Sequence, residues 1–254
     1  VLALVTWALS TNYFPSIYPN WDMMTRLIAS LLTSFLLFGS LMAHELMHSV
    51  VAQAAGIPVR SITLFVFGGV SEITKEPQNP KDELFIAAAG PLTSLVIGGI
   101  FWLIFLVSRN TFDVAGAIAA WLWQTNVVLA VFNLIPGFPL DGGRVLRSIL
   151  WWQKRDLRKA TRIASNIGRG VGYIFIFAGI YFTFGGALSI FGVIIGGFIN
   201  GLWFALIGWF MENAAAGSYR QVALQDILQG HTTSEVLTRE CSTVSPELTI
   251  QQLV

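Results

Sequence analysis

Long apolar runs separated by short polar segments follow one another along this chain. Residues 27–55, 84–107 and 114–135 each form one such run, and residues 170–210 are long enough for two helices with a turn at Gly185-Gly186. Residues 1–10 have the pattern of the end of a further helix. Because about 20 apolar residues cross a bilayer as a helix, the pattern predicts a polytopic α-helical membrane protein with about six transmembrane helices, the first truncated.

The composition supports a membrane protein and excludes other classes. Hydrophobic residues make up 54% of the 254 residues and charged residues 11%, whereas soluble domains are about 25% charged. A net charge of +1 argues against a nucleic-acid partner. The single cysteine, Cys241, excludes an internal disulfide and a zinc site built from cysteines.

The positive charges predict an orientation in the bilayer. Of the 15 Lys and Arg residues, only Arg26 and Arg109 fall in the loops on one side of the predicted helices. By the positive-inside rule the other side is cytoplasmic, and it would carry the C-terminus. Basic residues at helical spacing within 154–162, next to Trp151 and Trp152, further predict an interfacial helix on anionic lipid.

A segment rich in β-formers separates the second and third predicted helices. Residues 60–74 contain Val, Ile and Phe and are broken at Gly68-Gly69, which predicts a hairpin or re-entrant strand pair. An open strand edge there could receive an extended substrate by strand addition, so that Phe67, Gly68 and Gly69 are candidate substrate-binding residues. A purely structural hairpin is the alternative.

Two histidines lie one helical turn apart inside the run 27–55. In His44-Glu45-Leu46-Met47-His48 they occupy positions i and i+4, so both imidazoles lie on one helix face and can hold one metal ion. Glu45 can take a proton from the attacking water. Ionisable residues within a membrane span are functional candidates by default, which favours a metal site over a pair of interfacial histidines facing lipid headgroups.

A third ligand is predicted where the run 114–135 ends. A catalytic zinc site usually has three protein ligands, and Asp141, which follows the run 114–135, is the candidate that we add to His44, Glu45 and His48. Two prolines and three glycines within residues 136–143 must break the helix there, and a broken helix near the membrane is expected to line a site. The alternative is that Asp141 only ends a helix and pairs with Arg144.

Asn133 stands at the start of the same broken segment. Its amide could hold the substrate backbone or polarise the scissile carbonyl. An inter-helix hydrogen bond is the alternative role.

The motifs HELMH and NLIPGFPLDGGR resemble those of the site-2 protease family of intramembrane zinc metalloproteases, over about residues 27–147. The resemblance implies that His44, His48 and Asp141 hold one zinc ion per chain. It implies that Glu45 is the catalytic base.

Two further segments are similar to the same family. Ala89-Gly90-Pro91-Leu92 resembles a family motif that many relatives continue with an Asn, where this chain has Ser94. Residues 64–70 resemble the membrane-associated β-region that is thought to present substrate.

The polar tail resembles the opening of a cystathionine-β-synthase-type (CBS) domain. The resemblance covers residues 232–254, too short a stretch to fold alone, and predicts a truncated cytoplasmic module after a linker at 214–231. Residues 1–213 would form the transmembrane metalloprotease domain. In the complete chain such modules imply pairing into a homodimer and adenine-nucleotide binding. A short linker is the alternative interpretation of the tail.

The sequence therefore predicts a zinc-dependent intramembrane endopeptidase. The family resemblance implies that its substrates are membrane-anchored regulatory proteins, and the positive charges predict that its active site faces the cytoplasmic side of the bilayer. The alternatives are a membrane metal transporter, a zinc-binding scaffold without protease activity, and an unrelated membrane zinc protease whose third ligand is a Glu on a later helix. The last two predicted helices contain no acid, His or Arg in their interiors along which a transport path could run.

Overall fold

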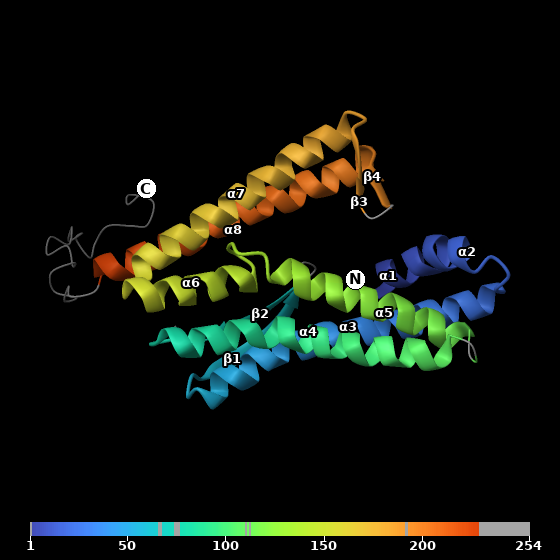
Figure 1. The fold of residues 1–254 in the computed structure, drawn as a ribbon, viewed down its shortest axis with the longest axis horizontal. Coiled ribbons are helices and arrows are strands. Elements are labelled where there is room, and N and C mark those ends of the chain that lie inside the picture. The colour runs from blue at the N-terminus through green and yellow to red at the C-terminus, as the bar shows by residue number, and fades with distance from the viewer. Residues whose placement is uncertain are drawn as a thin grey trace, which may run out of the picture.

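The computed structural model describes residues 2–65, 68–73, 77–109, 111, 113–190 and 193–228. Among these, four helices are long and apolar enough to cross a membrane: α3 (Met23–Ala54), α4 (Pro80–Ser108), α5 (Asp113–Asn133) and α7 (Leu157–Thr183). Figure 1 shows α3, α4 and α5 side by side, with α7 and α8 (Phe198–Leu228) as a second pair and α6 (Asp141–Lys154) between the two groups.

The prediction of about six transmembrane helices is corrected to four for the described part of the chain. The N-terminal apolar stretch forms only the seven-residue α1 (Leu2–Ala8), followed by a π-helical turn (η1, Leu9–Tyr13) and α2 (Phe14–Ile17). The 31-residue α8 is long enough, but Asn200, Glu212 and Asn213 interrupt its apolar sequence. Apolar length alone therefore overestimated the number of spans.

Side chains at the helix starts fix where the long helices begin. Asp22 precedes α3 and its carboxylate accepts hydrogen bonds from the backbone N–H of Met24 and Thr25. Asn79 caps α4 and Asp156 caps α7 in the same way. Each cap satisfies N–H groups that have no partner within the helix, which stabilises the helix start by about 1 kcal/mol.

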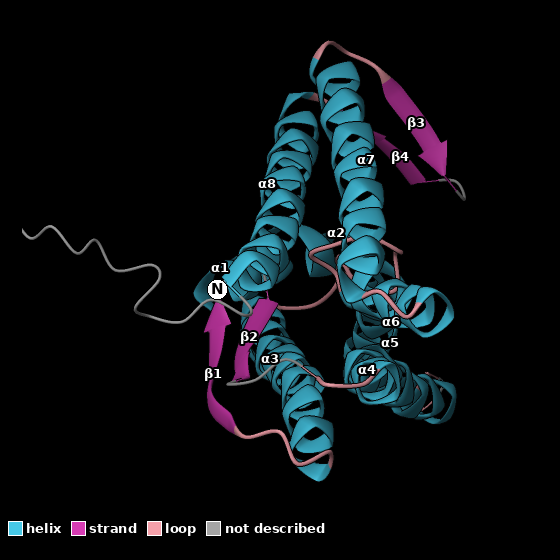
Figure 2. Cartoon of the chain, turned by 90° about the vertical axis from the view of Figure 1, so that its left-hand side faces the viewer, coloured by secondary structure: helices cyan, strands magenta, loops and turns pink. Residues whose placement is uncertain are grey.

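Two short antiparallel strand pairs connect the helices. The segment expected to form a hairpin contains β1 (Val59–Phe65) and β2 (Gly68–Ile73), which lie beside α3 (Figure 2). The second pair, β3 (Ala187–Ile190) and β4 (Val193–Gly196), joins α7 to α8. The sequence predicted only a glycine turn there, and Gly185 does turn the chain with φ 88° before β3 begins.

Glycines allow α7 and α8 to pack closely along their length. A Cβ atom built at Gly208 of α8 would lie 2.5 Å from the carbonyl oxygen of Gly172 of α7, and one at Gly179 of α7 would meet the backbone of Ala205. Small residues at such contacts let two helix backbones approach each other in a membrane. The Nε of Arg169 on α7 donates a 2.9 Å hydrogen bond to Glu212 of α8.

The predicted interfacial helix over residues 154–162 is wrong as a single element. α6 ends at Lys154, Arg155 adopts the left-handed conformation, and a new helix, α7, begins at Leu157. α8 continues to Leu228, so the first part of the expected linker is helical. The expected start of a CBS-like module at 232–254 lies outside the described residues.

Candidate metal centre

The structure brings together the three predicted ligands from two helices. His44 and His48 lie one turn apart on α3, and Asp141 is the first residue of α6. The Oδ2 of Asp141 is 3.2 Å from the Nε2 of His44 and 3.2 Å from the Nε2 of His48. One ligand atom from each residue lies within 4.8 Å of the others, so all three can reach the same ion.

The spacing of these atoms fits zinc. Two ligand atoms about 2.0–2.1 Å from a tetrahedral zinc ion are about 3.3 Å apart, close to the observed separations. Two imidazole nitrogens and one carboxylate oxygen are a usual ligand set for catalytic zinc, with the fourth position left for water. His44 and His48 are 3% and 5% exposed, so little solvent can compete with a metal ion for their ring nitrogens.

The outer ring nitrogens are held by groups on α4. The Nδ1 of His44 is 2.8 Å from the hydroxyl oxygen of Ser94, and the Nδ1 of His48 donates to the carbonyl oxygen of Ile86 at 2.6 Å. A hydrogen bond at Nδ1 fixes the ring orientation and leaves Nε2 free to bind a metal. The sequence left the role of Ser94 open. The structure places it in direct contact with His44, one of the three predicted metal ligands.

A glycine on α4 leaves the space in which an ion would sit. A Cβ atom built at Gly90 would collide with the Nε2 atoms of both His44 and His48. Any other residue at position 90 would therefore push into the region where the two nitrogens converge. The sequence had marked Gly90 only as part of a family motif, without a spatial role.

Tight packing after α5 places Asp141. The chain leaves α5 at Asn133, and residues 134–140 turn it into the first turn of α6. A Cβ atom at Gly142 or Gly143 would collide with the backbone of this loop. The Asp141 carboxylate faces both histidines, which favours a ligand role over that of a simple turn residue.

An ion pair that the sequence analysis missed joins the helices carrying the site. Glu83 of α4 is fully buried, and its Oε1 accepts hydrogen bonds from the Nε and Nη2 of Arg147 on α6, at 2.6 Å for the Nε. The guanidinium of Arg147 also lies 5.3 Å from the centre of the Phe138 ring. Glu83 stands one position before the apolar run 84–107, and its partner lies 64 residues later in the sequence, so no local pattern marked the pair.

The carboxylate of Asp141 is kept ionised by its neighbours. Asp141 lies on α6, outside the four candidate spans. Burial would raise its pKa, but hydrogen bonds and charge from His44 and His48 outweigh burial and hold the pKa well below its ordinary value. An ionised carboxylate is the form that binds a metal cation.

The other predicted site residues lie at different places. Glu45 is on α3, next to His44 and three residues before His48 in the sequence, and it is partly exposed. Asn133 is the last residue of α5, partly exposed and outside the group of three ligands. Gly68 and Gly69 begin β2, pairing with Phe65 and Leu64 of β1. Phe67 lies outside the described residues.

Comparisons with known proteins match the region of the chain that contains this site. The model of Peptidase family M50 matches residues 32–119 and 111–179 of the chain, which include all three ligands. Rip3 of Mycobacterium tuberculosis is 34% identical over 256 residues, covering 100% of this chain and 62% of that protein. The protein sll0528 of Synechocystis sp. is 38% identical over 253 residues, covering 99% of this chain and 63% of its own length.

A third relative is archaeal. The zinc metalloprotease MJ0392 of Methanocaldococcus jannaschii is 33% identical over 222 residues, covering 86% of this chain and 58% of that protein. The chain thus spans about three fifths of the length of the curated relatives it matches. The shared region contains the helices that carry the candidate metal centre.

Proposed function

Because this chain belongs to peptidase family M50, we propose that it is a zinc-dependent endopeptidase acting within the membrane. Its substrates would be membrane-anchored regulatory proteins, cut within or near their transmembrane segments. The observation that carries the proposal is the convergence of His44, His48 and Asp141 between an apolar helix long enough to span a bilayer and the start of α6. Ionisable groups in such a place mark a functional site.

The residues of the centre would have separate roles in peptide hydrolysis. His44, His48 and Asp141 would hold the zinc ion, and Ser94 and the Ile86 carbonyl would orient the two imidazoles. A bound zinc ion supplies a water of lowered pKa and polarises the scissile carbonyl.

Glu45 acts as the proton carrier in this proposal. It lies next to His44 and three residues before His48, so its carboxylate can reach the same side of α3. The carboxylate takes a proton from the attacking water and gives it to the leaving amine. Partial exposure of Glu45 supports this role, because an accessible carboxylate can reach both the attacking water and the leaving amine.

A helical substrate must unwind before its amide bonds can be cut. The strand pair β1–β2 lies beside α3, and an extended substrate segment added to its edge would lose its helical hydrogen bonds. Phe67, Gly68 and Gly69 would contribute to this surface. Asn133, at the end of α5, would hold the substrate backbone near the centre.

The topology and the tail complete the proposal. The cluster of basic residues around α6 and the start of α7 favours a cytoplasmic location for that side, together with the active site and the C-terminus. Residues 232–254 would begin a CBS-type module. A whole module of this type would bind adenine nucleotide and pair into a homodimer.

The proposal is tested first on a synthetic membrane peptide of designed sequence. The purified protein in detergent is mixed with a single apolar helix that carries helix-breaking residues in its centre and a fluorophore and quencher at its ends. The wild type should cleave it, and the Glu45→Gln variant should not, although both should contain one zinc ion per chain. The Asp141→Ala variant should lose zinc and activity together.

Two results would contradict the proposal. Cleavage by the Glu45→Gln variant at the wild-type rate would remove the role of Glu45. Zinc flux through protein-containing liposomes, with no cleavage of the peptide, would favour a transporter.

A further inference from the structure

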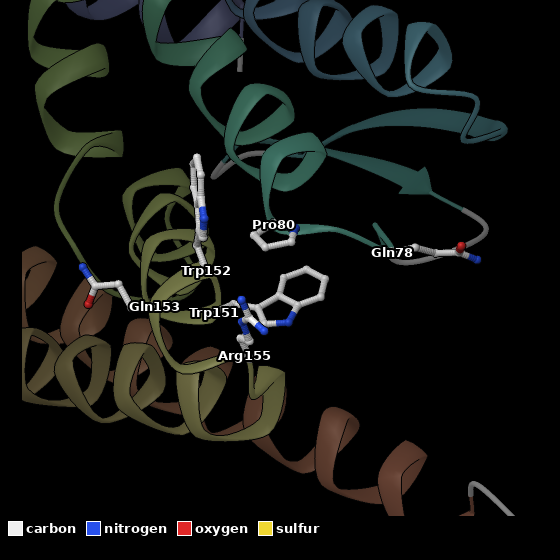
Figure 3. Close-up of a pocket in the computed structure, with 6 residues that line it drawn as sticks. All are labelled: Gln78, Pro80, Trp151, Trp152, Gln153 and Arg155. Carbon is white, nitrogen blue, oxygen red and sulfur yellow. The ribbon is translucent and has the colours of Figure 1, made fainter.

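A pocket lies apart from the metal centre, where α4 begins and α6 ends. It has a volume of about 500 Å³ and is lined by Gln78, Pro80, Trp151, Trp152, Gln153 and Arg155. Figure 3 shows Trp151 and Trp152 at the end of α6, on the side of Pro80. None of these residues belongs to the candidate metal centre.

The pocket lies at the boundary between membrane and water. Pro80 is the first residue of α4, and α7 begins at Leu157, two residues after Arg155. α4 is long and apolar enough to cross a bilayer, and its apolar run begins four residues after Pro80, so this end of α4 would lie near the level of the lipid headgroups. This placement holds whichever side of the membrane is cytoplasmic. Tryptophan is enriched at this level because its ring is amphipathic.

The charge at the pocket is positive. Arg155 lines it, and the Nζ of Lys81 lies 5.5 Å from the centre of the Trp152 ring. No acid is among the lining residues, and Arg155 forms no ion pair with any acid that the structure describes. The nearest acid in sequence, Asp156, is engaged by the ammonium of Lys159 at 3.1 Å. The pocket therefore offers cations to an anionic ligand.

The backbone of Arg155 gives an independent reason to assign it a function. Among the described residues, Arg155 is the one non-glycine residue with a positive φ, at 53°. A helix C-terminus in this conformation usually has glycine, because a side chain there costs about 1 kcal/mol. Residues kept in such strained conformations cluster at functional sites.

We propose that this pocket binds the headgroup of an anionic phospholipid. Its phosphate would contact Arg155 and Lys81, and its glycerol and upper acyl chain would lie against Trp151 and Trp152. A lipid is the occupant that fits best, because the pocket combines cations with aromatic rings at the depth where headgroup and acyl chain meet.

The test uses the full chain purified in detergent. It is titrated with phosphatidylglycerol and with phosphatidylcholine of the same acyl chains, and the lipid-bound fraction is measured by native mass spectrometry. The wild type should bind phosphatidylglycerol about fivefold or more tightly than phosphatidylcholine. Arg155→Gly should lose this preference while its unfolding temperature stays at or above that of the wild type, since glycine suits φ 53°.

Two further variants sharpen the comparison. Lys154→Ala removes an exposed positive charge one residue away that does not line the pocket, and should keep the wild-type preference. Arg155→Asn also tolerates the left-handed conformation and should lose the preference as Arg155→Gly does. The preference surviving in both Arg155 variants, or disappearing equally in Lys154→Ala, would overturn the proposal. Competition by glycerol phosphate as strong as that by the lipid would show a soluble-phosphate site instead.

Discussion

Glu83 of α4 and Arg147 of α6 form a buried ion pair that ties together the two helices on which the metal centre depends. Glu83 is 0% exposed and Arg147 6% exposed. Three residues after Glu83, the Ile86 carbonyl holds His48, and six residues before Arg147 stands Asp141. The pair therefore fixes the ligand from α6 relative to the histidines.

Breaking this pair should destabilise the protein strongly. Arg147→Met removes the hydrogen-bond donors to the buried Glu83 carboxylate and leaves it the longer contact with the Nε of Arg144 at 3.9 Å, which costs about 3 kcal/mol of unfolding free energy. Glu83→Gln combined with Arg147→Met should recover much of the loss, because no buried charge then remains. Thermal unfolding in detergent measures both. Arg169→Met, which breaks the more exposed contact with Glu212, should lower the unfolding temperature far less; an equal loss would contradict the importance of burial.

Ser94 should control zinc affinity through His44. Ser94→Ala removes the group that orients the His44 ring, and loss of such a contact typically weakens metal binding about 10- to 100-fold. Ser94→Thr keeps the hydroxyl and should bind zinc nearly as the wild type does. Competition with a chelator of known zinc affinity measures the zinc affinity of each variant. Wild-type affinity in the alanine variant would show that the His44 ring is held by packing alone.

The sequence predicted those parts of the site that depend on local geometry. His44 and His48 are one helical turn apart in any α-helix, so their shared face follows from the spacing alone. Asp141 could be predicted because prolines and glycines break the chain just before it. Ser94, Gly90 and the Glu83 pair required the packing of α4 against α3 and α6, which no local pattern contains.

The number of spans and the strands of the second hairpin could not be predicted from the sequence, for a different reason. An apolar run has no clear period, so the residues after the turn at Gly185-Gly186 were expected to begin a second helix, whereas residues 187–190 and 193–196 form β3 and β4. The four-residue strands lie between helices that the glycine contacts hold together, and those contacts are set by tertiary packing.

The contact between α7 and α8 predicts opposite effects for two glycines. Gly208→Ala would place a methyl group 2.5 Å from the carbonyl oxygen of Gly172, and should lower the unfolding temperature. Gly170→Ala meets no atom within 4 Å and removes a helix-destabilising glycine, worth about 1 kcal/mol, so it should leave the temperature unchanged or raise it. Thermal unfolding of the two variants side by side is the measurement. A tolerated Gly208→Ala would mean that the helices can separate at little cost.

The space above Gly90 gives a sharp test of the metal centre itself. Gly90→Ala introduces one methyl group, which would collide with the Nε2 atoms of both histidines at the point where an ion would be held. Gly99→Ala lies on the same helix, and its methyl group would meet no atom within 4 Å. Each substitution alone favours the helix by about 1 kcal/mol, so helix propensity cannot separate them.

Zinc content and activity should separate the two variants completely. Gly99→Ala should keep one zinc ion per chain and the cleavage rate of the wild type. Gly90→Ala should lose both while its circular dichroism spectrum remains helical, because the collision is confined to the histidine rings. Metal analysis of the purified variants, followed by the peptide cleavage assay, measures these effects. Zinc retained at full stoichiometry in Gly90→Ala would show that the ion sits elsewhere, and the assignment of His44 and His48 as ligands would fail with it.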